Sequence, residues 1–318
     1  MRLQLHLALF LFMPILSFSQ DYDKVFLLDS LENESYEDFH YLRKIKEYYS
    51  PNKKEEYVVE DYYKSGKIRM IGKSTNKDVM IKNGDFKFYY ENGNKQKIMK
   101  YEKSVPIGKI YLWHENGVMK AAGEFIASEK KKEEPELKIH QYWDIDKIQK
   151  VIDGNGIYDS DDEHYETTSS GTLVNGSRNG EWTGKNTRLK FTFKETYLNG
   201  KLISGESIDS IGLKHIYTKV FQTPEPIGGI EKFTKYIAKN YKAPQNVNVL
   251  ADSKLQVSFV VEKDGTVTKV KIRQSLRKDF DDAAIRVIRA YDKWQTGLFR
   301  GIPVRVSYNL PILIKKNT

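Results

Sequence analysis

The sequence contains no cysteine, so disulfides, thiolate catalysis and cysteine-ligated metal sites are excluded. Its nine prolines form no proline-rich run, so the chain has no stiff extended spacer. Four tryptophans against 21 tyrosines are typical of half-exposed β-sheet, where a ring packs while its hydroxyl stays wet. Aromatic residues make up 13% of the chain, too many for a disordered protein. We therefore expect a folded protein, and 318 residues predict about two domains.

One long apolar run is present, and it lies at the N-terminus, from Leu3 to Phe18. A positive charge precedes this run, and Ser17 lies where a signal peptidase reads small residues. We predict a signal peptide over residues 1–19, with cleavage before Gln20. The alternative is an uncleaved anchor, but a spanning helix needs about 20 apolar residues and Pro14 shortens this run. The prediction places the mature protein in the periplasm or cell envelope.

The net charge of +9 is concentrated at the C-terminus. Residues 219–318 contain 19 basic and 9 acidic side chains, a balance of +10, while the other 33 basic and 34 acidic residues nearly cancel. A basic module favours acidic peptides or anionic envelope surfaces, through an attraction that weakens in salt. Nucleic acid would also suit this charge. Export argues against that partner, and the aromatic residues Phe280, Tyr291 and Trp294 are expected in the core rather than free to stack on bases.

The middle of the chain repeats a short pattern. Residues 20–56 are predicted to be an amphipathic helical segment, and the repeats follow from residue 57 to residue 215. Aromatic strands there end in turns such as Asn92-Gly93 and Asn116-Gly117, and the two turn glycines are 24 residues apart. A fixed period of this size marks a repeat array. Asn-Gly favours two-residue hairpin turns in which both residues have positive φ, so we expect a row of stacked β-hairpins.

In these residues the sequence resembles MORN-like repeat proteins, whose units combine an aromatic-rich strand, an Asn-Gly turn and a second strand. The resemblance continues weakly at residues 176–182 and 197–201, and it implies a scaffold for protein or surface interactions. Asp153-Gly154-Asn155-Gly156 invites comparison with a calcium-binding EF-hand loop. Ile157, Tyr158 and His164 occupy positions 5, 6 and 12, where such a loop needs an oxygen ligand, glycine and glutamate. We therefore predict an acidic turn and no metal site.

The C-terminal module, residues 219–318, has the pattern helix, strand, strand, helix, strand. An apolar stripe at Ile230, Phe233, Ile237 and Tyr241 predicts the first helix, which Ala243-Pro244 would end. Alternation over residues 255–262 and 266–273, around the turn Asp264-Gly265, predicts a hairpin. The second helix is expected from about Asp279 to Trp294, with its apolar residues on one face. Every even position from Ile302 to Ile314 is apolar or aromatic, while Arg305, Ser307 and Asn309 occupy odd positions, which predicts one long strand with a core face and a wet face.

The module resembles the C-terminal domain of TonB-type energy transducers, in the form common in Bacteroidetes. The matching segments are Pro226 to Phe233 with Tyr236 to Asn240, Val257 to Val261 with Asp264 to Val267, Ala283-Ala284, Trp294, Gly301 to Val304, and Leu310 to Ile312. The resemblance covers about residues 221–315. It implies a domain that takes up an extended peptide from an outer-membrane transporter. The predicted fold is therefore α+β, an antiparallel hairpin array followed by a small domain of two helices and three strands.

The last strand supplies the candidate binding residues, because Pro311 marks it as an edge or a bulge. An edge strand can accept a partner strand through backbone hydrogen bonds. The predicted partner-binding residues are Val304, Arg305, Val306, Ser307, Tyr308, Asn309 and Leu310. The alternative is a buried strand without a free edge, since edges are usually protected.

Peptide binding has two alternatives. The protein could be an envelope scaffold in which the repeats, rather than the C-terminal module, bind the partner. An enzyme is disfavoured, because the six histidines have no paired ligand spacing and no nucleophile, phosphate-loop or zinc-protease motif occurs. The sequence thus predicts a non-catalytic protein without a cofactor, a metal or an evident small-molecule substrate. Its expected partner is an outer-membrane transporter or another envelope protein.

Overall fold

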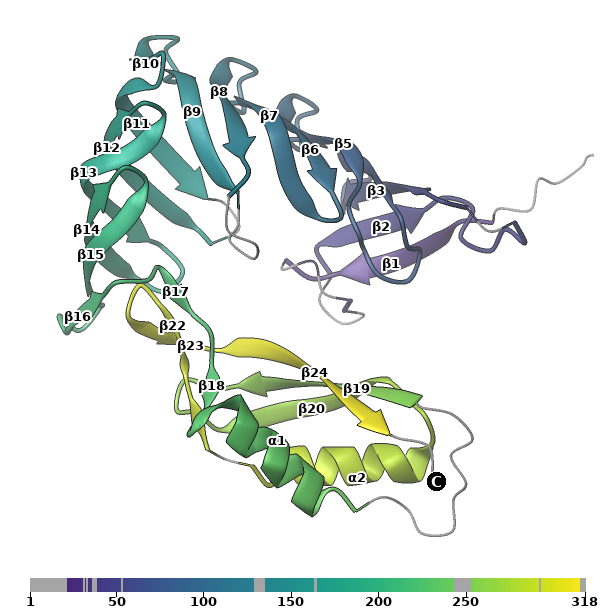
Figure 1. Cartoon of the computed structure of the whole chain (residues 1–318). Helices are drawn as coiled ribbons and strands as arrows, with labels where there is room; N and C mark the ends of the chain where they lie inside the picture. The colour runs from purple at the N-terminus through teal and green to yellow at the C-terminus, as the bar shows by residue number, and fades with distance from the viewer. Residues whose placement is uncertain are drawn as a thin grey trace, which may run out of the picture. The chain divides into compact units, whose positions relative to one another are not determined.

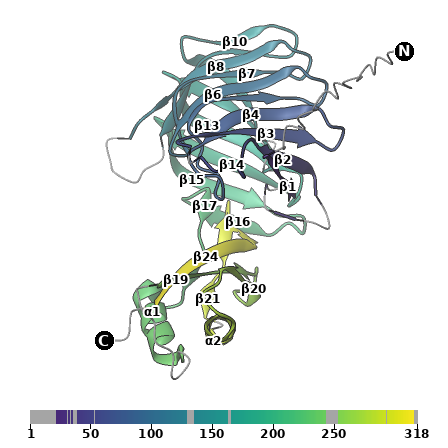
Figure 2. The same cartoon turned by 90° about the vertical axis from the view of Figure 1, so that its right-hand side faces the viewer.

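The computed structural model of the chain describes residues 22–30, 32, 34–35, 39–52, 54–128, 135–162, 165–242, 253–291 and 293–314 (Figure 1; Figure 2). The predicted signal peptide and the predicted helix end at Ala243-Pro244 lie outside these residues. Within the described part of the chain, no helix has the length and apolarity that crossing a membrane requires. Two compact units make up the protein, residues 1–136 and residues 137–318.

The first unit is an antiparallel array in which each strand pairs with the next along the chain. Its strands are β1 (Lys24–Leu28), β2 (Tyr41–Ile45), β3 (Tyr57–Tyr63), β4 (Ile68–Ser74), β5 (Gly84–Tyr89), β6 (Lys95–Glu102), β7 (Val105–Trp113) and β8 (Met119–Ile126). Their buried side chains form one core that includes Val59, Met70, Phe86 and Ile110. The predicted row of hairpins is therefore present in this unit.

The helix predicted for residues 20–56 is wrong, because β1 and β2 form a hairpin there instead. In β2 a charged residue, Arg43, occupies a core position, so the sequence does not show the alternation of apolar and polar residues that predicts a strand. Arg43 faces the core beside Ile45, and its Nε and Nη2 donate to the two carboxylate oxygens of Asp61 at 2.8 and 2.7 Å. An arginine is expected at the surface unless it is paired. Its partner lies on β3, so sequence alternation alone could not place Arg43 in the core.

The hairpin turns differ from the prediction in length. At Asn92-Gly93, the N–H of Gly93 donates to the carbonyl of Tyr90 at 2.9 Å, and the N–H of Tyr90 donates to the carbonyl of Asn94 at 2.9 Å. Of the two predicted turn residues, only Gly93 has a positive φ, 92°. Asn92 instead accepts the N–H of Asn94 on its side-chain oxygen at 2.9 Å. This is a three-residue turn closed by a glycine bulge, so positive φ at both residues was the wrong expectation.

The second unit begins with a similar antiparallel array. Its strands are β9 (Glu136–Trp143), β10 (Gln149–Ile152), β11 (Asn155–Asp162), β12 (Thr167–Val174), β13 (Ser177–Asn186), β14 (Phe191–Leu198), β15 (Lys201–Ile208) and β16 (Lys214–Tyr217). Two-residue turns with both φ values positive do occur here, as at Asn199-Gly200 with 48° and 80°. Asp153-Gly154 is such a turn, between β10 and β11, in agreement with the predicted acidic turn.

Aromatic rings in this array lie over glycines of the adjacent strand. Gly171 pairs with Trp182 across β12 and β13, and a Cβ on Gly171 would lie 2.4 Å from the indole ring. Gly205 pairs with Tyr217 across β15 and β16 in the same way, at 2.2 Å. A glycine normally weakens a strand, and here the ring covers the backbone that it leaves bare. In these two strand pairs, the glycine leaves room for the aromatic ring of the adjacent strand, and the ring packs directly on the glycine backbone.

We expect the Gly171→Ala substitution to lower the free energy of unfolding of the second unit by about 1–3 kcal/mol, because the new methyl group overlaps the Trp182 ring. The neighbouring Ser170→Ala substitution on β12 is the control. Urea unfolding monitored by tryptophan fluorescence measures both variants. Equal midpoints for the two variants would show that the ring can move aside, contrary to this account.

The C-terminal module contains both helices, α1 (Gly229–Asn240) and α2 (Lys278–Arg289), packed on a sheet of order β20-β19-β24. These strands are β19 (Ser253–Val261), β20 (Val267–Gln274) and β24 (Val306–Ile314). Two smaller sheets pair β17 (Phe221–Gln222) with β22 (Gly297–Phe299) and β23 (Ile302–Val304), and β18 (Glu225–Pro226) with β21 (Trp294–Gln295). Both helices cover the same face of the three-stranded sheet (Figure 1). The predicted α+β module of two helices and three main strands is present in outline.

Two boundaries in this module were predicted wrongly. The single long strand from Ile302 to Ile314 is divided at Arg305, because β23 pairs with β22 while β24 pairs with β19. Alternation of burial continues through the division, so the sequence pattern does not reveal it. The second helix ends at Arg289, and Trp294 lies in β21 rather than on the helix. Trp294 is nevertheless in the core as expected, where its ring meets Phe233 and Phe259 edge-on.

Candidate functional site

The predicted binding strand lies at an edge of the three-stranded sheet. Among the described strands, β24 pairs only with β19, in an antiparallel register from Val261↔Val306 to Ser253↔Ile314. Of the seven predicted residues, Val306 to Leu310 belong to β24. Val304 ends β23, and Arg305 lies between the two strands. The structure therefore brings five of the candidates onto one edge strand and leaves two beside it.

The two faces of β24 have different environments. The Tyr308 ring stacks on Phe259 at 5.3 Å between centroids and meets Trp294 edge-on at 5.1 Å. Leu310 also packs against this core. Ser307 and Asn309 are exposed on the opposite face. The predicted division into a core face and a wet face is confirmed, and the core face fixes the strand in place.

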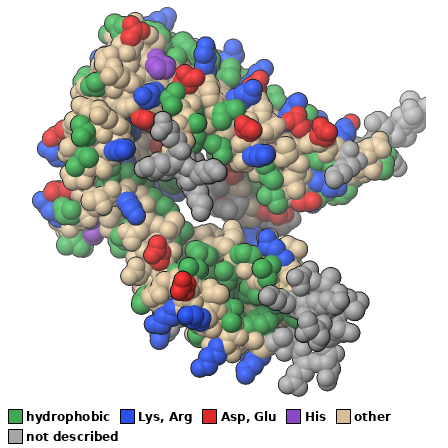
Figure 3. Space-filling model, in the orientation of Figure 1, with side chains coloured by type: hydrophobic (Ala, Val, Ile, Leu, Met, Phe, Trp, Pro, Cys, Tyr) green, Lys and Arg blue, Asp and Glu red, His purple; other side chains and the backbone are tan. Residues whose placement is uncertain are grey.

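The wet face of the sheet is predominantly basic. Lys254, Lys271 and Arg273 occupy this face on β19 and β20, and Arg273 donates to the hydroxyl of Ser258 at 3.0 Å. Arg305 pairs with Glu262 through its Nε, 2.6 Å from one carboxylate oxygen, and through Nη2, 3.0 Å from the other. The Thr268 hydroxyl and Arg305 hold the pKa of Glu262 below its ordinary value. Figure 3 shows further Lys and Arg side chains over the helical side of the module.

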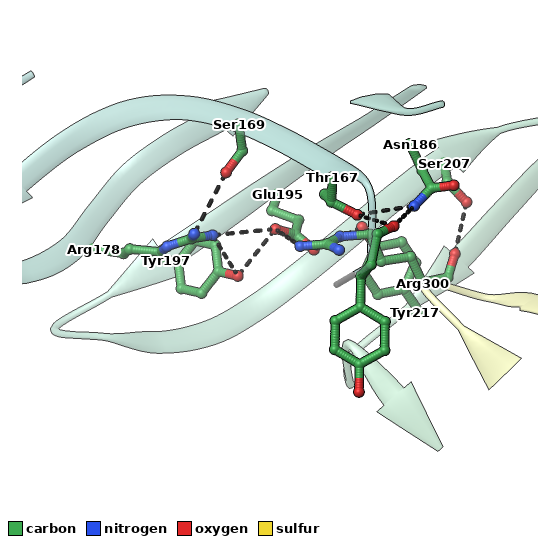
Figure 4. A network of polar contacts seen from close by, with 10 residues as sticks. Thr167, Ser169, Arg178, Asn186, Glu195, Tyr197, Ser207, Tyr217 and Arg300 are labelled. Atoms are coloured by element: carbon green, nitrogen blue, oxygen red, sulfur yellow. Dashed lines mark hydrogen bonds and ion pairs between the residues drawn. The ribbon is translucent and has the colours of Figure 1, made fainter. Parts of the chain in front are cut away.

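A second group of polar residues is buried where the module meets strands β14 to β16 of the same unit (Figure 4). Arg300 lies in the turn between β22 and β23, and its Nε donates to Oε1 of Glu195 at 2.9 Å. Glu195 is 0% exposed and Arg300 is 6% exposed. The hydroxyls of Tyr217 and Tyr197 donate to the same carboxylate at 2.8 and 3.0 Å. A buried carboxylate needs such partners, and Glu195 has an ion pair and two hydroxyl donors.

Backbone groups strengthen this junction. The Ser207 hydroxyl donates to the carbonyl of Arg300 at 2.6 Å, and the N–H of Arg300 donates to the carbonyl of Val220 at 2.7 Å. Phe299 packs against Phe191 beside them, at 5.9 Å between ring centroids. Burial, together with the charge of Glu195, raises the pKa of Tyr217, so this phenol stays a neutral donor. The β22–β23 hairpin is thus anchored on the repeat strands β14 to β16.

Sequence reasoning missed both Glu195 and Arg300. One signal was available, because Glu195 occupies a core position in the strict alternation of β14, between the buried residues Phe193 and Tyr197. A charge on the buried side of such a strand predicts a buried partner. Arg300 lies 105 positions further along the chain, and nothing in its own neighbourhood indicates burial. Among the described residues, no group of histidine, aspartate and glutamate side chains is arranged to hold a metal ion.

Comparison with known proteins identifies one segment. Residues 251–313 match the family described as Gram-negative bacterial TonB protein C-terminal. The match contains β19, β20, α2 and most of β24, and it covers about a fifth of the chain. No curated protein and no solved structure matches the chain. The C-terminal module therefore contains a TonB C-terminal domain, as the sequence resemblance implied, while the MORN-like identity of the repeats stays a prediction.

Proposed function

We propose that this chain is a non-catalytic envelope protein whose C-terminal module binds an extended segment of an outer-membrane transporter by strand addition to β24. The observation that carries the proposal is the unpaired outer side of β24 within the described sheet. Domains of the matched family interact with such transporters and belong to envelope proteins. The predicted export signal supports the same compartment. A role in TonB-dependent transport would follow if the bound segment belongs to a transporter.

Pro311 indicates which backbone groups of β24 are offered to a partner. In an antiparallel pair, alternate residues direct N–H and C=O toward the neighbouring strand, and the residues between them direct these groups away. Proline has no N–H, so it suits an edge position whose N–H would point away from the sheet. Ser307 and Asn309 have the same parity as Pro311. We infer that they present their N–H and C=O groups at the open edge, and that pairing with an added strand ends at Pro311.

The charge of the wet face favours an acidic partner. Lys254, Lys271 and Arg273 are neighbours on that face, whereas the charge of Arg305 is already shared with Glu262. An added strand would lie beside β24, and β24 and β19 would separate it from Lys271 and Arg273 on β20. These cations would therefore attract acidic residues of the partner toward the wet face over a distance rather than by direct contact. Backbone hydrogen bonds would supply affinity regardless of sequence, and the charges would supply selectivity.

Titration of labelled peptides against the mature chain, residues 20–318, tests the proposal by fluorescence anisotropy. N-terminal segments of outer-membrane transporters that contain acidic residues are expected to bind with a dissociation constant below 1 mM, and more weakly as salt increases. The same peptides with proline at alternate positions are the control, because they cannot complete the backbone pairing. Absence of binding at submillimolar peptide, or equal binding of the proline peptides, would contradict strand addition.

The repeats are a second candidate binding surface. Apolar side chains are exposed on the last repeat strand and the turn before it, including Ile211, Leu213 and Ile216, the last with 67% of its surface accessible. Such a patch is a common feature of protein-binding surfaces. Cutting the chain after the repeats is a poor test, because it would leave Glu195 without Arg300. An Ile216→Lys variant of the whole chain avoids this, and loss of envelope partners by this variant alone would favour the scaffold function.

A further inference from the structure

A pocket of about 200 Å³ opens beside the buried polar group, between strands β11 to β13 and the segments that anchor the C-terminal module. Its lining includes Arg178 on β13, Arg300 in the β22–β23 turn, and Phe221 on β17. The pocket is smaller than a typical drug-sized site and suits a compact ligand.

Two guanidinium groups, of Arg178 and Arg300, and two carboxylates, of Glu195 and Asp162, lie at this pocket, and Glu195 is closer to Arg300 than to Arg178. Figure 4 shows the guanidinium groups of Arg178 and Arg300 on either side of the single Glu195 carboxylate. Arg300 takes the close position, with Nε at 2.9 Å and Nη2 at 3.5 Å from the two oxygens. Arg178 Nη1 is 3.9 Å from the carboxylate, so it is only loosely paired.

The hydrogen bonds of Arg178 are long for a charged donor. Its Nη1 is 3.4 Å from the Tyr197 hydroxyl, and its Nη2 is 3.4 Å from the Ser169 hydroxyl. Charge-assisted bonds of arginine are usually about 2.7–2.9 Å. The guanidinium carbon lies over the Trp182 ring, 4.1 Å from its centroid, and this cation–π contact helps to hold the group in place. Arg178 is therefore a positioned cation with donor capacity to spare, and 27% of its side chain is accessible.

Aromatic rings form the other wall. Tyr165 and Phe221 line the pocket with 49% and 45% of their surfaces exposed, and Tyr165 stacks on Phe299 at 5.5 Å between centroids. Exposed rings beside a fixed cation would pack against the apolar part of a ligand whose charged end reaches the cation. A wall of exposed rings therefore favours an organic anion over an inorganic one.

We propose that this pocket binds a small monocarboxylic acid with a ring-sized apolar body. The carboxylate accepts hydrogen bonds from Arg178, whose planar fork matches its two oxygens, and the apolar body packs against Tyr165 and Phe221. Asp162 also lines the pocket, and its Oδ1 accepts the N–H of Tyr165 at 3.1 Å. Its negative charge opposes each anionic charge on a ligand, so we expect dianions such as phosphate to bind more weakly than a monocarboxylate. The same chemistry could come from a free acid or from the C-terminus of a peptide.

The ligand would also tighten the attachment of the C-terminal module. The pocket walls combine repeat strands with Phe221, Phe299 and Arg300, which belong to the anchoring segments. A ligand that contacts both sets binds only the anchored arrangement and therefore stabilises it. We expect the Tm of the unit to rise by about 3 °C at ten times the dissociation constant, for a unit of this size.

Calorimetric titration of the mature chain with 3-phenylpropionate tests the proposal. Binding with a dissociation constant of about 1 mM or tighter is expected for a ligand of this size. Acetate and inorganic phosphate should each bind at least about ten times more weakly, because acetate lacks the ring and phosphate carries the additional negative charge. Phosphate binding as tightly as the acid, or acetate binding equally well, would overturn the assignment.

Variants separate the site from general charge effects. Arg178→Met keeps the packing on Trp182 and removes the charge, so it should weaken 3-phenylpropionate at least about tenfold. Lys185→Met, on the exposed face of the same strand, changes the net charge equally and should leave binding unchanged. Unaltered binding by a folded Arg178→Met variant would refute the proposal. A tripeptide ending in phenylalanine, compared as free acid and as amide, then distinguishes the two sources. Binding of the acid form but not of the amide would assign a peptide C-terminus, and binding of 3-phenylpropionate without binding of the tripeptide would assign a free acid.

Discussion

Glu195→Gln is expected to destabilise the second unit by about 3–5 kcal/mol, because it leaves the buried Arg300 guanidinium without its counter-charge. Glutamine retains the size of the side chain, so the loss reports the charge rather than a cavity. Urea unfolding of the full chain, monitored by tryptophan fluorescence and circular dichroism, measures the effect. A change of this size is a large fraction of the stability of an ordinary domain.

The chain supplies a matched control for this substitution. Glu181 forms an ion pair with Lys194 at 2.6 Å, but both side chains are exposed, so Glu181→Gln should cost less than about 1 kcal/mol. The double variant Glu195→Leu with Arg300→Met removes both charges and should recover most of the stability lost by Glu195→Gln. If Glu195→Gln costs no more than Glu181→Gln, the buried pair does not anchor the hairpin.

Asn309→Pro is expected to weaken the transporter peptide by at least about 30-fold while leaving the module folded. Proline removes the N–H that we infer to face the open edge, and its ring obstructs the incoming strand. Losing one or two backbone hydrogen bonds at about 1 kcal/mol each, together with this obstruction, accounts for the magnitude. Anisotropy titration of the variant against the best wild-type peptide provides the measurement.

Leu313→Pro is the control for Asn309→Pro. Leu313 has the same parity in β24 but lies beyond Pro311, where pairing with an added strand should already have ended. We therefore expect its peptide affinity to match that of the wild type. A folded Asn309→Pro variant that still binds the peptide would exclude β24 as the pairing edge. A large fall in the Tm of the Asn309→Pro variant would show instead that the N–H of Asn309 faces β19.

The hairpin array could be predicted from sequence because its signals are local. Aromatic alternation and Asn-Gly turns act within one hairpin, and they placed the strands around Gly93 and Gly117 correctly. Buried charges were not predictable in the same way. Arg43 and Glu195 each lie on the core side of a strand, and each is made tolerable by a partner from another element. Alternation read along one strand cannot supply that partner.

The C-terminal module shows the same limit at its boundaries. Apolar or aromatic residues occupy every even position from Ile302 to Ile314, yet the chain changes sheets at Arg305. Trp294 continues the apolar spacing of α2 by coincidence, because the short strand β21 places it in the same core. The spacing of apolar residues in the sequence indicates which side chains are buried. It does not report which neighbour the backbone pairs with, because that depends on distant residues.

The route from β24 to the anchored hairpin has a mechanical consequence. Only Arg305 separates β24 from β23, and Arg300 lies in the turn just before β23. Tension on a peptide paired with β24 would therefore pass along the backbone into this hairpin. It would be resisted there by the Glu195–Arg300 ion pair and by the Ser207 hydrogen bond, in addition to the covalent connection after β16. A pulled module would transmit force to the repeat strands through two attachments, one covalent and one reversible.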